Sequence, residues 1–269
     1  MNLFVLGTGH AFAEDIYNTC FCLQNGNDFM LVDAGGGREI LKQLDLSLID
    51  LNMINYAFIS HTHTDHLLGF AWVIRKIVQS YISKERTLSF TIYGNAECIN
   101  AIHHLSLSIL GEKIFNTYFE KFIKLEEVKA DERKNIMNLN FNFFDVLDPD
   151  LTQFGFEIEE YKFVFAGDIP LNKCYYDRFK NCRYICLEAF CAESDKEGKE
   201  AQLKKHKTVH EASVAANKLN AENVIIWHTE NCEFRKVKYS LEAKKSYKGN
   251  IIIPDDLELI YIEKFDENE

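Results

Sequence analysis

The feature that most constrains this chain is a group of three histidines and one aspartate within residues 61–66. The group follows a short apolar run at residues 56–59, which predicts a buried strand. It precedes residues 67–82, where apolar side chains recur at helical spacing. We therefore expect four side chains of metal-ligand type, His61, His63, Asp65 and His66, in a tight turn between a strand and a helix.

Imidazole nitrogen binds zinc and other late divalent metals, and a carboxylate adds charge compensation. On a tight turn His61 and His63 can point one way, while Asp65 and His66 point to a neighbouring position. This arrangement suits two adjacent metal ions. The alternative is a polar loop at a helix start, in which Thr64 or Asp65 caps the helix. We favour the metal interpretation because a cap needs one such residue and the segment has four in this order.

Short apolar runs alternate with segments of helical spacing along the rest of the chain. Strands are predicted at residues 3–6, 19–23, 29–32, 56–59, 87–93, 139–146, 156–158, 163–165, 184–187, 224–227, 251–253 and 257–262. Helices are predicted at residues 38–46, 67–82, 96–110 and 209–219. This alternation, with no linker rich in proline, glycine or serine, favours the α/β class and a single domain over residues 1–269.

Composition narrows the classes of partner. The formal net charge of −11 argues against a broad nucleic-acid-binding field. No apolar run approaches the ~20 residues that span a bilayer, and the first residues lack the basic segment of a signal peptide. None of the eight cysteines forms a Cys-x-x-Cys pair, so free thiols are expected. These features are typical of a soluble, cytoplasmic protein without a membrane partner.

The segment His-x-His-x-Asp-His resembles the signature of the metallo-β-lactamase superfamily. Further matches are Gly7-Thr8-Gly9 after the first strand, Asp33 with the glycines after it, Gly167-Asp168, and Trp227-His228-Thr229-Glu230. The resemblance implies a four-layer αββα sandwich: two sheets back to back, helices outside, and metals at one end.

The resemblance also implies a ligand set. Asp168 would be the bridging aspartate and His228 the last histidine, although a turn aspartate and a core histidine are the alternatives for each residue alone. One metal position, with Asp65, His66, Asp168 and His228, is complete. The implied cofactor is zinc, as one or two ions.

The other position lacks a ligand. It holds His61, His63 and a share of Asp168, but the family's further histidine is missing, because no histidine occurs between residues 104 and 206. We expect Asp148 to substitute, with Asp145 as the alternative. A carboxylate there would shift the metal preference from zinc toward manganese or magnesium.

Within the superfamily the chain is most similar to ribonuclease Z-like proteins. The segment Leu-Glu-Ala-Phe at residues 187–190 stands where that branch has His-Glu-Ala-Thr, and His206-Lys207-Thr208 where it has a His-Ser-Thr-like segment. Leu187 cannot transfer a proton, whereas His206 is retained. Only twelve residues separate Gly155 from Asp168, which leaves no room for the branch's tRNA-binding arm. Binding of a whole tRNA is therefore not expected.

These features predict a metal-dependent hydrolase, of the phosphodiesterase or ribonuclease Z-like kind, acting on a small phosphoester or a short nucleic acid. Asp65 would bind metal and orient the nucleophile, and His206 would act as the acid or stabilise developing charge. One alternative is a thioester or lactone hydrolase on the same fold. Another is a degenerate member that binds a metal or nucleotide without turnover. By analogy with relatives, the chain would form a homodimer.

Overall fold

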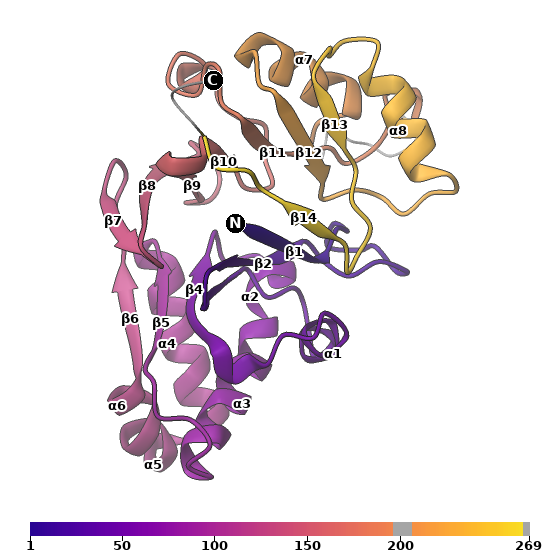
Figure 1. Ribbon diagram of the computed structural model, residues 1–269. Coiled ribbons are helices and arrows are strands. Elements are labelled where there is room, and N and C mark those ends of the chain that lie inside the picture. The colour runs from indigo at the N-terminus through magenta and orange to yellow at the C-terminus, as the bar shows by residue number, and fades with distance from the viewer. Residues whose placement is uncertain (196–205, 266–269) are drawn as a thin grey trace. The chain divides into compact units, whose positions relative to one another are not determined.

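The computed structural model describes residues 1–195 and 206–265, in which two compact units are recognisable (Figure 1). Unit 1 comprises Met1–Gly7, Tyr17–Lys129 and Asp256–Tyr261. Unit 2 comprises Thr8–Ile16, Ala130–Asp255 and Ile262–Glu269. The units interleave along the chain, because each contains segments from both ends. The assignment of residues 1–269 to a single domain stays a prediction.

Unit 1 contains a seven-stranded sheet in the order β14-β1-β2-β3-β4-β5-β6. Its strands are β1 (Asn2–Gly7), β2 (Cys20–Asn25), β3 (Asp28–Val32), β4 (Ile54–Ile59), β5 (Phe90–Gly94), β6 (Ile123–Glu127) and β14 (Leu259–Tyr261). The pairs from β14 to β3 are antiparallel, and those from β3 to β6 are parallel. Parallel pairing brings the carboxyl ends of β3 and β4 to the same edge, and the histidine cluster follows β4 at that edge.

The helices of unit 1 pack on this sheet and supply much of its apolar core. They are α1 (Glu39–Leu46), α2 (Thr64–Leu67), α3 (Gly69–Ile82), α4 (Ala96–Leu110), α5 (Glu112–Ile114) and α6 (Glu120–Phe122), with a π-helical turn at Phe115–Phe119. The helix predicted at 67–82 is divided at Leu68 into α2 and α3. Gly69 explains the break, because its nitrogen donates to the Gly35 carbonyl (2.8 Å) and a Cβ there would collide with the Ala34 carbonyl oxygen.

Unit 2 contains a second seven-stranded sheet, in the order β13-β12-β11-β10-β9-β8-β7. Its strands are β7 (Arg133–Ile136), β8 (Leu139–Asp145), β9 (Phe154–Ile158), β10 (Phe163–Phe165), β11 (Tyr184–Glu188), β12 (Asn223–Trp227) and β13 (Asn250–Ile252). The pairs from β10 to β13 are parallel, and those from β7 to β10 are antiparallel. The strands predicted at residues 156–158 and 163–165 are present as β9 and β10, which form a hairpin whose turn is a 3₁₀ segment at Glu159–Tyr161.

The helices of unit 2 are α7 (Val209–Leu219) and α8 (Arg235–Ala243). Helix α7 begins at the predicted residue because Thr208 and Glu211 form a capping box, and it ends at Asn220 in the left-handed conformation. Among the residues that the structure describes, no helix is long and apolar enough to cross a membrane. All eight cysteines are free, as expected.

Candidate metal centre

The histidine cluster of unit 1 lies between the end of β4 and the first turn of α2, as predicted. His61, Asp65 and His66 are buried, and His63 is exposed. The ring of His61 is 4.5 Å from that of His63 and 4.2 Å from that of His66, measured between centroids. The Nε2 atom of His66 lies 3.3 Å from Oδ2 of Asp65. The four predicted side chains therefore converge within unit 1.

Asp33, at the end of β3, holds two of these rings in place. Its Oδ2 atom lies 2.8 Å from Nδ1 of His66 and accepts a hydrogen bond from the Ser60 hydroxyl (2.7 Å). That hydroxyl lies 3.0 Å from Nδ1 of His61. These contacts are made through the Nδ1 atoms, and a polar contact on one ring nitrogen is the usual arrangement around a metal-binding histidine.

Asp33 supports the histidine cluster, although the sequence marks it only as part of a glycine turn. Its backbone φ is 55°, and the Ala34 nitrogen donates to the His66 carbonyl (3.0 Å). Asp33 could have been found from its position: it is an acidic residue directly after an apolar strand, and three glycines follow it closely at residues 35–37. The glycine turn thus fixes both the backbone and one ring of the cluster.

The candidate residues of unit 2 lie at neighbouring strand ends. Asp168 follows β10, Glu188 ends β11, and His228 follows β12. Since these strands are parallel, their carboxyl ends meet at one edge of the sheet. The Nε2 atom of His228 lies 3.5 Å from Oδ2 of Asp168, and both residues are buried. The structure therefore brings together two of the predicted ligands.

His206 joins this group together with Glu188, a residue that the sequence reasoning did not single out. Ligand atoms of Glu188, His206 and His228 all lie within 4.8 Å of one another. The Glu188 carboxylate accepts a hydrogen bond from the Lys207 nitrogen (2.7 Å), and its Oε2 atom lies 3.5 Å from Nδ1 of His206. Burial raises the pKa of Glu188, against the opposing effect of His206. The sequence feature that could have marked Glu188 is its place as the second residue of the Leu-Glu-Ala-Phe segment at residues 187–190.

The His228 backbone is held by a buried arginine. His228 has φ of 54°, and Thr229 after it donates its nitrogen to the Thr8 carbonyl (3.0 Å). The Arg235 guanidinium donates to the hydroxyl groups of Thr8 and Thr229 and to the Pro254 carbonyl. Arg235 therefore ties the strand end to the 8–16 loop and to the segment after β13.

In the described residues 145–153, where the family's further histidine is missing, neither Asp145 nor Asp148 forms a hydrogen bond with Asp168. Asp145 and Asp148 each close a local turn, because their Oδ1 atoms accept from the nitrogens of Leu147 (2.8 Å) and Asp150 (3.0 Å). The side chain that reaches Asp168 is Gln153, which is fully buried and donates from Nε2 to Oδ1 of Asp168. No sequence pattern marks Gln153 as part of a site. Asp148 as a metal ligand stays a prediction.

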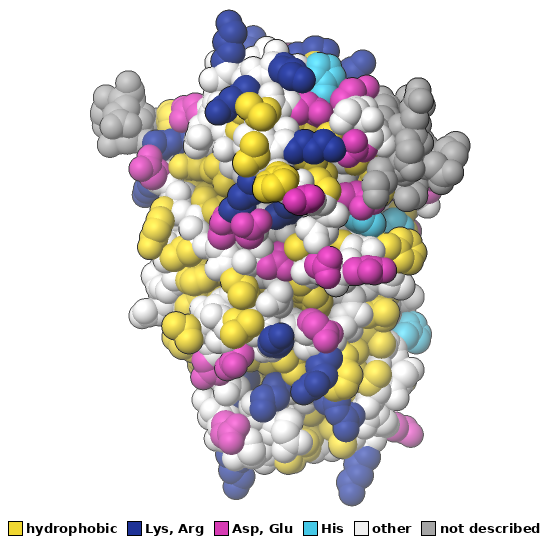
Figure 2. Space-filling view, turned by 90° about the vertical axis from the view of Figure 1, so that its right-hand side faces the viewer, with side chains coloured by type: hydrophobic (Ala, Val, Ile, Leu, Met, Phe, Trp, Pro, Cys, Tyr) yellow, Lys and Arg dark blue, Asp and Glu magenta, His cyan; other side chains and the backbone are white. Residues whose placement is uncertain are grey.

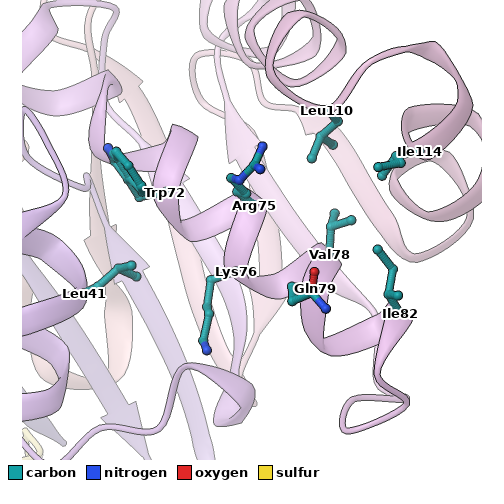
Figure 3. Close-up of a pocket in the computed structure, with 9 residues that line it drawn as sticks. All are labelled: Leu41, Trp72, Arg75, Lys76, Val78, Gln79, Ile82, Leu110 and Ile114. Carbon is teal, nitrogen blue, oxygen red and sulfur yellow. The ribbon is translucent and has the colours of Figure 1, made fainter.

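Buried imidazoles and carboxylates in both units are donor types that fit a divalent metal. Among the cavities of the described residues, a groove of about 290 Å³ in unit 1 differs in kind (Figure 3). It lies beside α3 and is lined by apolar and basic or amide side chains, including Trp72, Arg75 and Ile114. It contains no acidic, histidine or cysteine side chain, so it has no group that could bind a metal or activate water.

Comparison with known proteins identifies the family of the chain. The family model described as Anti-Pycsar protein Apyc1 matches residues 1–219, which is most of the chain. The chain belongs to the Anti-Pycsar protein Apyc1 family. The family match spans all the predicted ligands except His228.

A curated relative is a Ribonuclease Z from Methanococcus aeolicus, which is 33% identical over 106 residues. That match covers 39% of this chain and 31% of the relative, so the chain matches about a third of its length.

Solved structures extend the likeness to nearly the whole chain of this Apyc1 family member. The metallo-β-lactamase fold protein YhfI from Bacillus subtilis has a TM-score of 0.79 at 17% identity, covering 96% of this chain and 98% of that one. A diphosphatase of the PhnP family has a TM-score of 0.75 at 14% identity, covering 98% of each chain. At these identities the likeness is one of fold. The predicted metallo-β-lactamase fold of the α/β class, and the likeness to ribonuclease Z, are confirmed.

Proposed function

We propose that this chain is a metal-dependent phosphodiesterase. The proposed ligands are His61, His63, Asp65 and His66 of unit 1, and Asp168 and His228 of unit 2. The observation that carries the proposal is the convergence of the unit 1 side chains, with Asp33 and Ser60 holding the imidazoles by Nδ1. Buried charged groups in proteins are paired or bind a metal, and clusters of such groups are typical of functional sites.

A bound divalent cation would supply a water of lowered pKa and polarise a phosphoryl oxygen of the substrate. Because four of the six proposed ligands are imidazoles, zinc is the proposed metal, with manganese as the alternative. Asp65 is proposed to orient the attacking water as well as to bind metal.

His206 is the proposed proton donor to the leaving oxygen. Two contacts support this role: the Glu188 carboxylate 3.5 Å from its Nδ1, and the Phe190 ring stacked 5.2 Å from its own at 15°. A carboxylate on one ring nitrogen fixes the ring and stabilises its protonated form, so that the other nitrogen can give up a proton. Glu188 is therefore proposed as the residue that positions His206.

The proposed substrate is a small phosphodiester or a short nucleic acid. A cavity of about 370 Å³ in unit 2 is lined by Glu188, Leu187, Lys207 and the loop after Asp168, and it suits a small organic group beside the proposed acid. On the face drawn in Figure 2, acidic and basic side chains lie among each other. This pattern and the net charge of −11 disfavour a long polyanion.

The direct test combines elemental analysis with turnover of bis(p-nitrophenyl) phosphate. We expect bound metal and hydrolysis in the wild type, and loss of both in His63→Ala. His104→Ala is the control, because that exposed ring contacts the Asn100 carbonyl on α4. Thioester and lactone substrates are assayed in parallel. Hydrolysis of the thioester or lactone substrates alone would replace the proposed phosphodiesterase by a hydrolase of carbonyl compounds. Bound metal without any turnover would indicate a degenerate member that binds metal only.

Processing of a precursor tRNA is expected to be weak or absent at physiological salt. The twelve-residue segment between Gly155 and Asp168 forms β9, its turn and β10, so it has no residues left for an arm. Efficient 3′ cleavage would contradict the proposed substrate class. The free cysteines suit a reducing compartment, and we propose the cytoplasm. The homodimer stays a prediction.

A further inference from the structure

We propose that the outer face of α8 docks an acidic, amphipathic helix of a partner protein. The docking surface consists of Phe234, Val237 and Leu241, which we call the α8 stripe. Figure 1 shows α8 at the outer edge of unit 2. The stripe contains none of the proposed metal ligands, so this proposal is independent of the proposed function.

The α8 stripe lies on the side of the helix that faces away from the core. The buried residues of α8 are Arg235, Tyr239 and Ala243. At about 100° per residue, the three stripe positions fall together on the opposite side. Their exposed fractions are 73%, 60% and 61% in chain order. A surface helix normally turns its apolar residues to the core. The α8 stripe instead exposes an apolar row with the i, i+3, i+7 spacing that packs against a second helix.

The backbone of Phe234 is held in an uncommon conformation. Its φ of 57° and ψ of 29° are left-handed, which glycine or asparagine would adopt at lower cost. The Phe234 carbonyl accepts from the Lys238 nitrogen (2.9 Å), and the Arg235 nitrogen donates to the Cys232 carbonyl (3.1 Å). Such conformations persist where the surroundings fix them, and they cluster at functional sites. The exposed aromatic side chain is therefore anchored before any partner binds, which lowers the entropy cost of docking.

The segment that carries the stripe differs in charge from the rest of the chain. Residues 235–248 contain six basic residues and one acidic residue, a formal charge of +5, whereas the whole chain has −11. A basic segment in an acidic chain attracts an acidic partner. It also repels the same segment of a second copy, so self-association through this face is disfavoured.

Two lysines at the end of the stripe are available to an acidic partner. Lys236 and Lys238 each pair with an aspartate, at 2.9 and 2.6 Å. Lys244 and Lys245 are exposed, and among the described residues neither ammonium group has an ion pair. They follow Leu241 at i+3 and i+4, so they lie beside it on the helix surface. Carboxylates of the partner helix would pair with these two lysines.

The acidic groups next to the stripe favour a helix over an anionic membrane as the occupant. Glu233 and Glu242 each lie one residue from the stripe in the chain, and two of the lysines are already paired. A flat anionic bilayer would approach these carboxylates together with the lysines. A helix about 10 Å wide contacts the stripe and the lysines beside it without covering the carboxylates.

The test uses a designed, fluorescein-labelled helical peptide of about 20 residues, with leucines at i, i+4, i+7 and i+11 and glutamates beside them. Fluorescence anisotropy with the full chain should show saturable binding in the micromolar range. One control peptide carries lysine in place of glutamate, and another has the same composition in scrambled order. Each control should bind at least roughly tenfold more weakly, because it lacks either the charge or the apolar row.

Variants place the binding on the stripe. Leu241→Ser should weaken peptide binding roughly tenfold, whereas Leu48→Ser, at a leucine of unit 1 that is 93% exposed, should leave it unchanged. Changing Lys244 and Lys245 together to glutamate should weaken the acidic peptide and strengthen the lysine peptide. Lys218→Glu makes the same charge change in the last turn of α7 and should alter neither affinity. Circular dichroism checks that each variant keeps the fold.

Three results would overturn the proposal. The first is no binding of the acidic peptide, or equal binding of the scrambled one, or an unchanged affinity in folded Leu241→Ser. The second is a dimer in sedimentation that Leu241→Ser abolishes, which would assign the stripe to a second copy. The third is binding to vesicles of phosphatidylcholine and phosphatidylglycerol without binding of the peptide, which would assign the stripe to a membrane.

Discussion

The two halves of the candidate centre are built in different ways. In unit 1, four candidate ligands come from six consecutive residues, and Asp33 and Ser60 contact two of them through hydrogen bonds of 2.7–3.0 Å. In unit 2, the candidates come from the ends of separate strands and from His206, more than thirty residues from Asp168. The unit 1 candidates thus form a local sequence motif held by the buried Asp33, whereas the position of the unit 2 candidates depends on the order of the strands.

This difference shows where each half is vulnerable. The unit 1 half depends on the turn at the end of β3, since one carboxylate orients His66 and receives Ser60. The unit 2 half depends on contacts that hold the strand ends together, of which Arg235 makes four: to Thr8, Thr229, Pro254 and Asp255. Ligand loss should therefore affect both halves equally, whereas loss of support should affect them differently.

The largest expected effect is the removal of one ligand from either half. His66→Ala and His228→Ala should each lower phosphodiester turnover by about 10³-fold or more, because each change removes a proposed metal ligand. Elemental analysis should show reduced metal in both variants, and His104→Ala should retain the wild-type value. If His228→Ala retained full activity and His66→Ala lost it, His228 would not be needed for hydrolysis.

The next effect concerns the stability of unit 2. Arg235→Met should lower the free energy of unfolding by about 3 kcal/mol, because buried hydrogen-bond acceptors lose a charged donor. The matched control is Lys236→Met, whose ammonium also pairs with Asp255 (2.9 Å) but is 40% exposed. That change should cost less than about 1 kcal/mol. Equal losses in urea denaturation would show that Arg235 does not hold the strand end.

A smaller effect is expected from the support of unit 1. Asp33→Asn keeps a side chain that tolerates φ of 55° but removes the negative charge beside His66. Zinc affinity, measured by competition with a chelator, should fall roughly 10- to 100-fold with the fold retained. Asp28→Asn, at the other end of β3, is the control and should leave the affinity unchanged. An affinity unaffected by Asp33→Asn would refute the orienting role.

The smallest expected effect is on the pH dependence of stability, and it comes from Glu157, a partly buried carboxyl of unit 2 that is not among the candidate ligands. Burial raises the pKa of Glu157 in β9 above 4.5, against the opposing effect of Arg178. The folded state therefore keeps a proton that the unfolded state loses, and this carboxyl makes stability fall as pH rises from about 4.5 through the folded pKa. Glu157→Gln should remove that fall, so the difference in unfolding free energy between variant and wild type should increase over this range. If urea denaturation at several pH values gave a constant difference in unfolding free energy between Glu157→Gln and the wild type, the predicted effect of Glu157 would be contradicted.

Local patterns allowed much of the fold to be predicted. Residues 96–110 and 209–219 form helices with the predicted bounds, because Asn95 caps the Cys98 nitrogen (2.9 Å) and Thr208 forms a capping box. The strands β6 and β7 and the helix α8 were missed. Charged or amide residues make up three of the four residues of β7, three of the five of β6 and four of the nine of α8, so apolar periodicity is too weak to mark these elements.

By itself, the sequence determined the chemistry of the unit 1 half, the α/β class and the family resemblance, because these depend on residue types at short, fixed spacings. Tertiary structure alone decided that Asp33 orients His66, that Glu188 meets His206, and that Gln153 contacts Asp168. Each of these contacts joins residues 15 to 33 positions apart. Which strand ends become neighbours follows from sheet order and register, and these depend on the burial of the whole core.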